Sequence, residues 1–400
     1  MTEAPELPLE MRRDGLDPVE ELARLRDDEG VVRVETLFGA PAYLVSRYKD
    51  VRAVLADPAR FSNARTPLFG LADGGDVTEE ELARMRAGTM LGFDPPEHTR
   101  LRRMLTPEFT AHRIRRLEPR IVETIEAALD DLERAGRPAD LMAHFAIPVP
   151  SLVLCELLGV PYADRADFQG RTARLLDTSL SMEQRSAARR EDQEYLAELV
   201  ARARVEPGED MLGMLVREHG DDLSTDELIG IASLLVIAGT ETTSNMLGLG
   251  TLALLRHPDQ LAMIRDDPAR VEPAVEELLR WLSIPHSLLP RKTTTDVEVG
   301  GHTIPEGSFV VVSIPAANRD GAFIDNPDTL DITRGAAGHL AFGHGVHFCI
   351  GHPLARMQMC LAFPALLRRF PRLAPARPYE QTEFRASSLV FGLDSLWVTW

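Results

Sequence analysis

The chain has 400 residues, of which 44% are hydrophobic and 26% are charged. This composition is ordinary for a globular protein and too apolar for a disordered one. Its three cysteines exclude a disulfide scaffold and are typical of a reducing compartment, and its net charge of −18 argues against binding to nucleic acid or to an anionic membrane. The stretch 1–30 has no apolar core of a signal peptide, so we expect a cytoplasmic protein without a membrane segment.

The first elements expected along the chain are two strands, at 31–37 and 42–46, which flank Gly39-Ala40-Pro41 and so predict a hairpin. Helical periodicity predicts the longer elements, which are 113–135, 150–158, 273–282 and 353–370. A second β region follows Arg291, with short strands expected at 297–299, 303–304 and 309–313. No repeat or linker divides the sequence. We therefore expect one mainly α domain over residues 1–400, with small sheets attached.

The clearest predicted helix lies between Ser224 and Pro258. Ser224 and Glu227 have the spacing of a capping box, and Pro258 disfavours continuation of the helix. The helix would span about 32 residues, or about 48 Å at 1.5 Å per residue. Residues 228–255 carry one charge, that of Glu241, and are long enough to cross a bilayer. Several glycines, several hydroxyl residues and an acidic upstream flank favour instead a helix buried in protein.

Glu241 lies in the middle of this apolar helix. A buried carboxylate needs a partner, water or a raised pKa. Gly239 and the neighbouring threonines weaken the helix locally and can open a bulge. Ala238, Glu241 and Thr242 share one small, polar face, which suits a flat ligand and proton traffic. An ordinary buried ion pair of Glu241 is the alternative.

The segment 342–351 is a second candidate centre. It holds three glycines and Cys349, just before the helix expected from residue 353. A cysteine before a helix N-terminus favours the thiolate, which is the form that binds metals. Two alternatives stay open at this point. Cys349 can be a small buried apolar residue, or it can join nearby histidines in a zinc site, although paired ligands such as C-x2-C are missing. The histidines in question are His339, His344, His347 and His352.

Two further patterns are weak by themselves. Glu277 and Arg280 are three residues apart on a predicted helix, as many surface pairs are. Seven arginines lie between residues 100 and 120, and a solvated face or a docking surface for an acidic partner would explain them. His98 precedes Arg102 by four residues, so both can share a helix face.

Together, four motifs in this order resemble the cytochrome P450 family of haem-thiolate monooxygenases. They are 94–102 with His98 and Arg102, Ala238-Gly239-Thr240-Glu241-Thr242, Glu277-x-x-Arg280, and the 342–351 loop with Cys349. The resemblance covers essentially the whole chain, and 146–162 is similar to the soluble actinobacterial branch, which oxidises polyketides, macrolides, statins and steroid-like compounds. It implies a mainly α, single P450-like domain with many helices around a buried haem.

The resemblance also implies roles for individual residues. Cys349 would be the axial thiolate ligand of haem b (iron protoporphyrin IX), and Glu241 and Thr242 would be the acid–alcohol pair that guides protons to oxygen. Glu277 and Arg280 would form a buried structural pair joined by Arg334. The other residues implied to bind the cofactor are His98, Arg102, Ala238, Gly239, Arg291, Phe342, Gly343, His347 and Gly351.

The implied substrate pocket is a set of apolar residues from four regions of the sequence. Its members are Phe69, Met90, Leu91, Leu234, Ala238, Leu288, Leu289, Leu389 and Val390. They predict a bulky apolar ligand with few polar anchors.

We therefore expect a monomeric monooxygenase that hydroxylates or epoxidises a hydrophobic small molecule with O2. Electrons would come from NAD(P)H through a ferredoxin reductase and a ferredoxin, and the arginine-rich stretch 100–120 would face the ferredoxin. A peroxygenase driven by H2O2 is a first alternative, although its relatives tend to lack the acid–alcohol pair. A non-catalytic zinc or haem-binding protein is a second.

Overall fold

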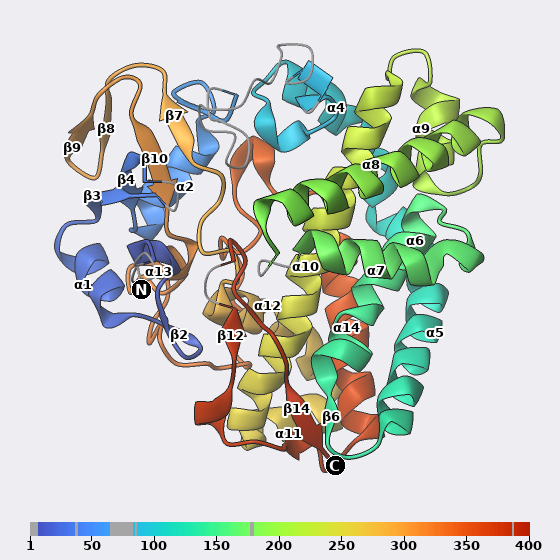
Figure 1. The fold of residues 1–400 in the computed structure, drawn as a ribbon. Coiled ribbons are helices and arrows are strands. Elements are labelled where there is room, and N and C mark those ends of the chain that lie inside the picture. The colour runs from blue at the N-terminus through green and yellow to red at the C-terminus, as the bar shows by residue number, and fades with distance from the viewer. Residues whose placement is uncertain (1–6, 37–38, 65–82, 85, 177–179, 386–387) are drawn as a thin grey trace. The chain divides into compact units, whose positions relative to one another are not determined.

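Helices make up most of the computed structural model, which describes residues 7–36, 39–64, 83–84, 86–176, 180–385 and 388–400 (Figure 1). The mainly α fold expected from the sequence is confirmed. The α-helices are α1 (Glu20–Asp28), α2 (Tyr48–Ala56), α4 (Glu97–Leu105), α5 (Ala111–Ala135), α6 (Pro148–Leu158), α7 (Arg165–Leu176), α8 (Met182–Val205), α9 (Met211–His219), α10 (Thr225–Arg256), α11 (Pro258–Asp266), α12 (Val271–Leu282), α13 (Ile314–Asn318) and α14 (His352–Arg369).

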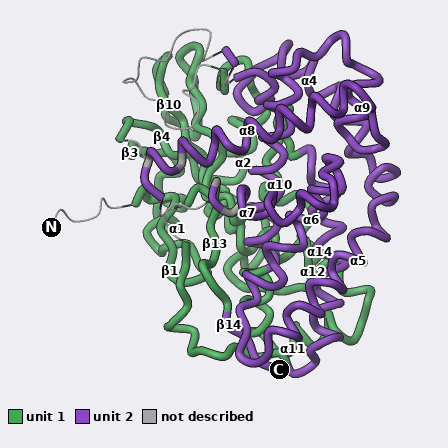
Figure 2. The backbone as a smooth tube through the Cα atoms, turned by 45° about the vertical axis from the view of Figure 1, so that its right-hand side comes forward, with its two compact units in different colours: residues 1–72, 248–349, 373–396 green, residues 73–247, 350–372, 397–400 purple. Residues whose placement is uncertain are grey.

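The chain forms two compact units, each assembled from segments far apart in the sequence (Figure 2). Unit 1 comprises Met1–Ala72, Gly248–Cys349 and Leu373–Leu396. Unit 2 comprises Asp73–Leu247, Ile350–Arg372 and Trp397–Trp400. Helix α10 therefore contributes its first part to unit 2 and its last part to unit 1.

Unit 1 is built on a five-stranded sheet with the strand order β3-β4-β10-β7-β5. The predicted hairpin is the antiparallel pair β3–β4, and β10 lies parallel to β4 and antiparallel to β7. A separate hairpin, β8–β9, matches the other short strands expected from the sequence. The bounds of these strands are β3 (Val31–Glu35), β4 (Pro41–Val45), β5 (Phe61–Ser62), β7 (Arg291–Thr293), β8 (Val297–Val299), β9 (His302–Ile304) and β10 (Phe309–Val312).

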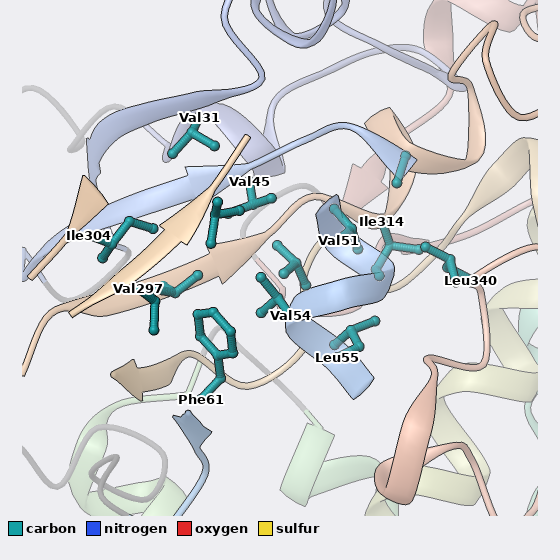
Figure 3. Close-up of a cluster of buried hydrophobic side chains, with 14 residues drawn as sticks. Val31, Val45, Val51, Val54, Leu55, Phe61, Val297, Ile304, Ile314 and Leu340 are labelled. Atoms are coloured by element: carbon teal, nitrogen blue, oxygen red, sulfur yellow. The ribbon is translucent and has the colours of Figure 1, made fainter. Parts of the chain in front are cut away.

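Alternate residues of β10 fill two different cores, because successive side chains of a strand point to opposite faces. Val310 and Val312 join the cluster that includes the apolar side chains of α2, such as Val54 (Figure 3). Val311 joins the second cluster, with Leu22 of α1. The sheet is therefore covered by α2 on one face and by α1 on the other.

Unit 2 contains α5, which packs against both α6 and α14. Ile121 and Ile125 of α5 are buried at helical spacing. At the far end of α14, Arg369 forms ion pairs with Asp130 at 2.5 Å and Glu133 at 2.6 Å of α5. Strand β6 (Ala139–Asp140), which follows α5 in the chain, pairs antiparallel with β14 (Trp397–Thr399) near residue 400.

Helix α10 has 32 residues, as the sequence predicted. The capping box is present, because Ser224 N donates to Glu227 Oε2 at 2.7 Å and Glu227 N donates to Ser224 Oγ at 3.1 Å. Pro258 is the first residue of the next helix, α11. Across the described part of the chain, every helix is too short or too polar to cross a membrane.

Glu277 and Arg280 of α12 form an ion pair at 2.8 Å, and both side chains are fully buried. The guanidinium of Arg280 also donates to Asn318 O at 3.0 Å and to Pro327 O at 2.7 Å. Arg334 approaches Glu277 at 3.5 Å. The charges are thus satisfied by several partners at once, which a buried pair requires if it is to be stable.

We predict that Arg280→Met destabilises the protein by about 3–5 kcal/mol, because it leaves Glu277 buried beside fewer partners. The measurement is the midpoint of urea unfolding, followed by circular dichroism.

The matched control is Arg265→Met, which breaks the surface pair of Arg265 with Asp266. It should leave the midpoint unchanged, since exposed pairs contribute little. Equal losses in the two variants would show that the buried network has no special role.

Candidate functional site

The loop that carries Cys349 lies directly against α2 in unit 1. Gly343 and Gly345 both have φ of +74°, a conformation that favours glycine. A Cβ on Gly345 would lie 2.5 Å from the carbonyl oxygen of Leu55 and 3.0 Å from Cα of Ala56. No larger residue fits, so the loop backbone is held at its closest approach to α2.

Cys349 is held by its own backbone. Its N–H donates to the carbonyl oxygen of Phe342 at 2.9 Å, which closes the loop around the 3-10 turn Gly345–His347. The rings of Phe342 and Phe348 pack edge to face with centroids 6.4 Å apart. Cys349 stays partly exposed, three residues before the first residue of α14. The sulfur of a partly exposed cysteine held in such a loop is, once deprotonated, a suitable soft ligand for haem iron, so the donor chemistry fits a haem-thiolate centre.

The histidines around this loop have other partners. His339 Nε2 lies 3.1 Å from Glu276 Oε2, and His344 Nε2 accepts from Arg52 Nε at 3.2 Å. Burial and the charge of Arg52 lower the pKa of His344. Among the residues that the structure describes, no three His, Cys, Asp or Glu side chains are placed to hold a metal ion. The zinc cluster considered from the sequence is therefore not formed.

Unit 1 also brings together several of the apolar residues expected to contact substrate. Pro285 forms a β-bridge with Val390, and Phe391 N donates to Ile284 O at 2.8 Å. Leu288 packs close to Gly343: a Cβ on Gly343 would lie 3.3 Å from the Leu288 side chain. Segment 284–289 thus contacts both 389–391 and 342–343, and these segments include the partly buried Leu289 and the exposed Leu389.

Two of the residues expected to bind the cofactor's carboxylates lie in strand β7 and in the cysteine loop. Arg291 is 2% exposed within β7, where it pairs with Val310 of β10. His347 ends the 3-10 turn before Cys349 and is partly exposed. Gly351 directly precedes α14, to which it belongs as the N-cap residue.

In unit 2, His98 and Arg102 lie one turn apart on α4. His98 is 2% exposed. Burial and the nearby charge of Arg102 lower the pKa of His98, and Asp94 opposes this shift. The neutral imidazole can therefore donate one hydrogen bond to an anionic ligand, while Arg102 supplies the charge.

One face of α10 is accessible in the middle of this apolar helix. Ala238 is exposed, and Leu234, Glu241 and Thr242 are half-buried. The Thr242 hydroxyl donates to the carbonyl oxygen of Ala238 at 2.7 Å. This bond fixes the orientation of the hydroxyl, whose oxygen can still accept a further hydrogen bond.

Gly239 lies on another side of α10 than the accessible face. A Cβ there would lie 3.1 Å from the side chain of Leu154 in α6. Gly239 therefore allows α10 to pack closely on α6, and the cofactor contact expected at this residue stays a prediction. About 100° separates successive residues of a helix, so Gly239 and Ala238 need not face the same partner.

The remaining pocket residues lie before α4. Met90 and Leu91 form the short turn Met90–Gly92, in which Met90 is 4% exposed and Leu91 is half-buried. Phe69 lies outside the described residues.

The arginine-rich stretch is less uniform than the sequence suggests. Arg100 pairs with Glu97, Arg113 with Glu108 and Arg120 with Glu123. Exposed arginines also occur there, at Arg103, Arg115 and Arg116. Sequence spacing alone could not separate the paired arginines from the exposed ones, because the acidic partner of each arginine depends on the fold.

One residue that the sequence reasoning did not assign connects the buried ion pair to the cysteine loop. Asn318 donates to Ser283 Oγ at 2.8 Å and accepts from Leu340 N at 2.7 Å. Its own carbonyl binds Arg280. In the sequence, Asn318 stands out only as an amide residue that follows an apolar stretch and precedes Arg319.

Comparison with known proteins agrees with this picture. The family model for cytochrome P450 matches residues 208–391. Cytochrome P450 FAS1 of Rhodococcoides fascians is 60% identical over 395 residues, which cover 99% of each chain. Pentalenic acid synthase of Streptomyces avermitilis is 42% identical over 387 residues, covering 96% of this chain and 94% of that protein.

A solved structure gives the same result. P450 StaH from biosynthesis of the glycopeptide antibiotic A47934 superposes with a TM-score of 0.90 at 44% identity, covering 99% of this chain and 100% of that one. Since relatives of such identity span nearly the whole sequence, the chain belongs to the cytochrome P450 family of monooxygenases.

Proposed function

We propose that this P450 uses haem b and ferredoxin-supplied electrons to insert one oxygen atom into a hydrophobic small molecule. The observation that carries the proposal is the rigid, partly exposed Cys349 at the end of a glycine loop. The overall reaction takes substrate, O2, two electrons and two protons to hydroxylated substrate and water. Residues 1–400 form one functional domain in this proposal.

The haem iron, when bound, supplies the activation of O2, and the thiolate of Cys349 favours cleavage of the O–O bond. The Cys349 N–H bond to Phe342 holds the sulfur in place. His98, Arg102, Arg291 and His347 would bind the two propionates, and two of them, His98 and Arg291, are buried. Ala238, Phe342, Gly343 and Gly351 would offer small or flat surfaces to the ring.

Glu241 and Thr242 handle the protons. The Thr242 hydroxyl is fixed by its bond to Ala238 O, and Glu241, the preceding residue, is half-buried as Thr242 is. The carboxyl group of Glu241 can take a proton from solvent, and the Thr242 hydroxyl can pass it on or hold a water in position. The presence of this pair argues against a pure peroxygenase, which needs no proton relay for O2 reduction.

The proposed substrate class is supported by the apolar residues expected to line the pocket and by the names of two similar proteins. Met90, Leu234 and Leu288 are apolar, so the ligand is bulky and hydrophobic. Pentalenic acid synthase and a vitamin D3 dihydroxylase of Streptomyces griseolus are each 42% identical to this chain. We propose a polyketide, macrolide, statin or steroid-like substrate.

An acidic ferredoxin is the proposed electron donor. The exposed Arg103, Arg115 and Arg116 of α4 and α5 provide positive charge in a chain whose net charge is −18. Complementary charge speeds encounter between such proteins. A protein without a membrane-crossing helix in its described part suits a diffusible donor.

The proposed reaction is tested with isotopically labelled O2. The haem-loaded enzyme is incubated with NADH, ferredoxin reductase, ferredoxin and a panel of polycyclic and macrocyclic compounds. Mass spectrometry should find a product with one labelled oxygen atom. Product formed equally fast from H2O2 alone, without label from O2, would instead support a peroxygenase.

A second prediction concerns proton delivery. Thr242→Ala should lower the product formed per NADH by about ten-fold or more, with H2O2 released in its place, because general acid catalysis contributes about 100-fold or more. The assay measures NADH, product and peroxide together.

Thr243→Ala is the matched control, because Thr243 is the neighbouring hydroxyl and is buried on another side of α10. Its yield of product per NADH should equal that of the unmodified enzyme. If both variants stay fully coupled, Thr242 has no role in proton delivery.

A further inference from the structure

A turn before α4 touches the first turns of α10 through two glycines, both in unit 2. Gly88 has φ of +69°, and a Cβ there would lie 2.8 Å from Ile231 N. A Cβ on Gly230 would lie 2.9 Å from the carbonyl carbon of Ala87. Side-chain carbons do not approach backbone so closely, so this contact between two backbones requires glycine at both positions.

An ion pair holds the same two segments together. Arg100 of α4 pairs with Glu97 at 2.7 Å and also with Glu227 in the first turn of α10. It donates further to the carbonyl oxygen of Asp222 at 3.2 Å, just before α10. Glu227 is also the capping residue for Ser224. The start of α10 is therefore fixed relative to α4 and the turn that precedes it.

The turn follows Gly88 closely. Met90 N donates to Gly88 O at 2.8 Å, and Gly92 N donates to Thr89 O at 2.9 Å. Met90 and Leu91 therefore cannot move far without Gly88. The glycine contact thus fixes two of the residues expected to line the substrate pocket.

Gly230 lies on the same face of α10 as the proposed reaction centre. Residues 230, 234, 238 and 241 are three or four apart, so they share one side of the helix. Leu234 and Ala238 are the accessible residues between them. Twelve residues separate Gly230 from Thr242, or about 18 Å at 1.5 Å per residue. The turn thus covers this face about 18 Å from the proton-delivery pair.

We propose that Gly88 and Gly230 are positioning residues that set the length of the substrate-binding face on α10. The turn they hold in place acts as the end wall of that face, which favours compact ligands over ones whose apolar part is much longer than about 18 Å. The proposal rests on the proposed function, because it takes the α10 face as the place where substrate lies.

The test uses two probes that bind haem iron through the same group but differ in length, N-methylimidazole and N-dodecylimidazole. Their dissociation constants for the haem-loaded enzyme are measured from the shift of the haem absorbance. In Gly230→Ala, the added methyl group displaces the turn. Moving the end wall away from α10 makes room for the long chain, so the ratio of the dodecyl to the methyl dissociation constant should fall about ten-fold, while the methyl constant changes by less than about two-fold.

Gly170→Ala is the matched control, since Gly170 is an exposed helical glycine of α7 whose Cβ would meet nothing within 4 Å. It should bind both probes as the unmodified enzyme does. Alanine stabilises a helix relative to glycine, so a change in the probe ratio of Gly230→Ala comes from the contact between Gly230 and the turn, not from a weakened helix.

A second pair decides the matter if Gly230→Ala does not fold. Asparagine tolerates a positive φ better than other side chains do. Gly88→Asn should change the probe ratio in the same way. Gly301→Asn should not, because Gly301 has φ of +84° but open space around it.

The outcomes separate the two proposals. A normal thiolate-type haem spectrum with equal changes for both probes, or with no change in either glycine variant, overturns the role of the two glycines alone. An unmodified enzyme that carries no thiolate-ligated haem overturns the proposed function, and the role of the glycines with it.

Discussion

The placement of Cys349 depends on the buried ion pair between Glu277 and Arg280. Arg280 binds the carbonyl of Asn318, and the Asn318 side chain accepts from Leu340 N. Two residues later, the carbonyl of Phe342 accepts from Cys349 N. Three hydrogen bonds and a two-residue step along the chain thus join Cys349 to a charge pair that is costly to break. A rigid support of this kind is what a ligand needs if its distance to a metal must stay constant.

Helix α10 serves two purposes that need different faces. One face leaves Ala238, Glu241 and Thr242 accessible, and another packs Gly239 on Leu154 of α6. The accessible face is small and polar in an otherwise apolar helix, so the helix makes fewer apolar contacts there. Gly239 lets the side chain of Leu154 approach the helix backbone, and Gly230 lets the backbone of Ala87 approach it.

Much of the fold could be predicted from local patterns. The ends of α10 follow from Ser224 and Pro258, and the β3–β4 hairpin follows from its turn residues, because both signals act within a few residues. Long-range partners could not be predicted in this way. Arg100 reads as one of several surface arginines until Glu227, far along the chain, is seen beside it. The contact of Gly88 with Gly230 and the bonds of Asn318 are equally invisible without the fold. At the candidate site, the sequence motifs selected Cys349 and Thr242, but they could not show that Gly239 packs against Leu154.

The most direct measurement is the absorbance spectrum of the purified protein, reduced and exposed to CO, compared with that of Cys349→Ser. A thiolate ligand from Cys349 predicts a strongly red-shifted haem band in the unmodified protein and its loss in the variant, while Cys155→Ser, at a buried cysteine in α6, keeps the band. Folded protein that takes up haem but shows the same band with and without Cys349 would contradict the central claim.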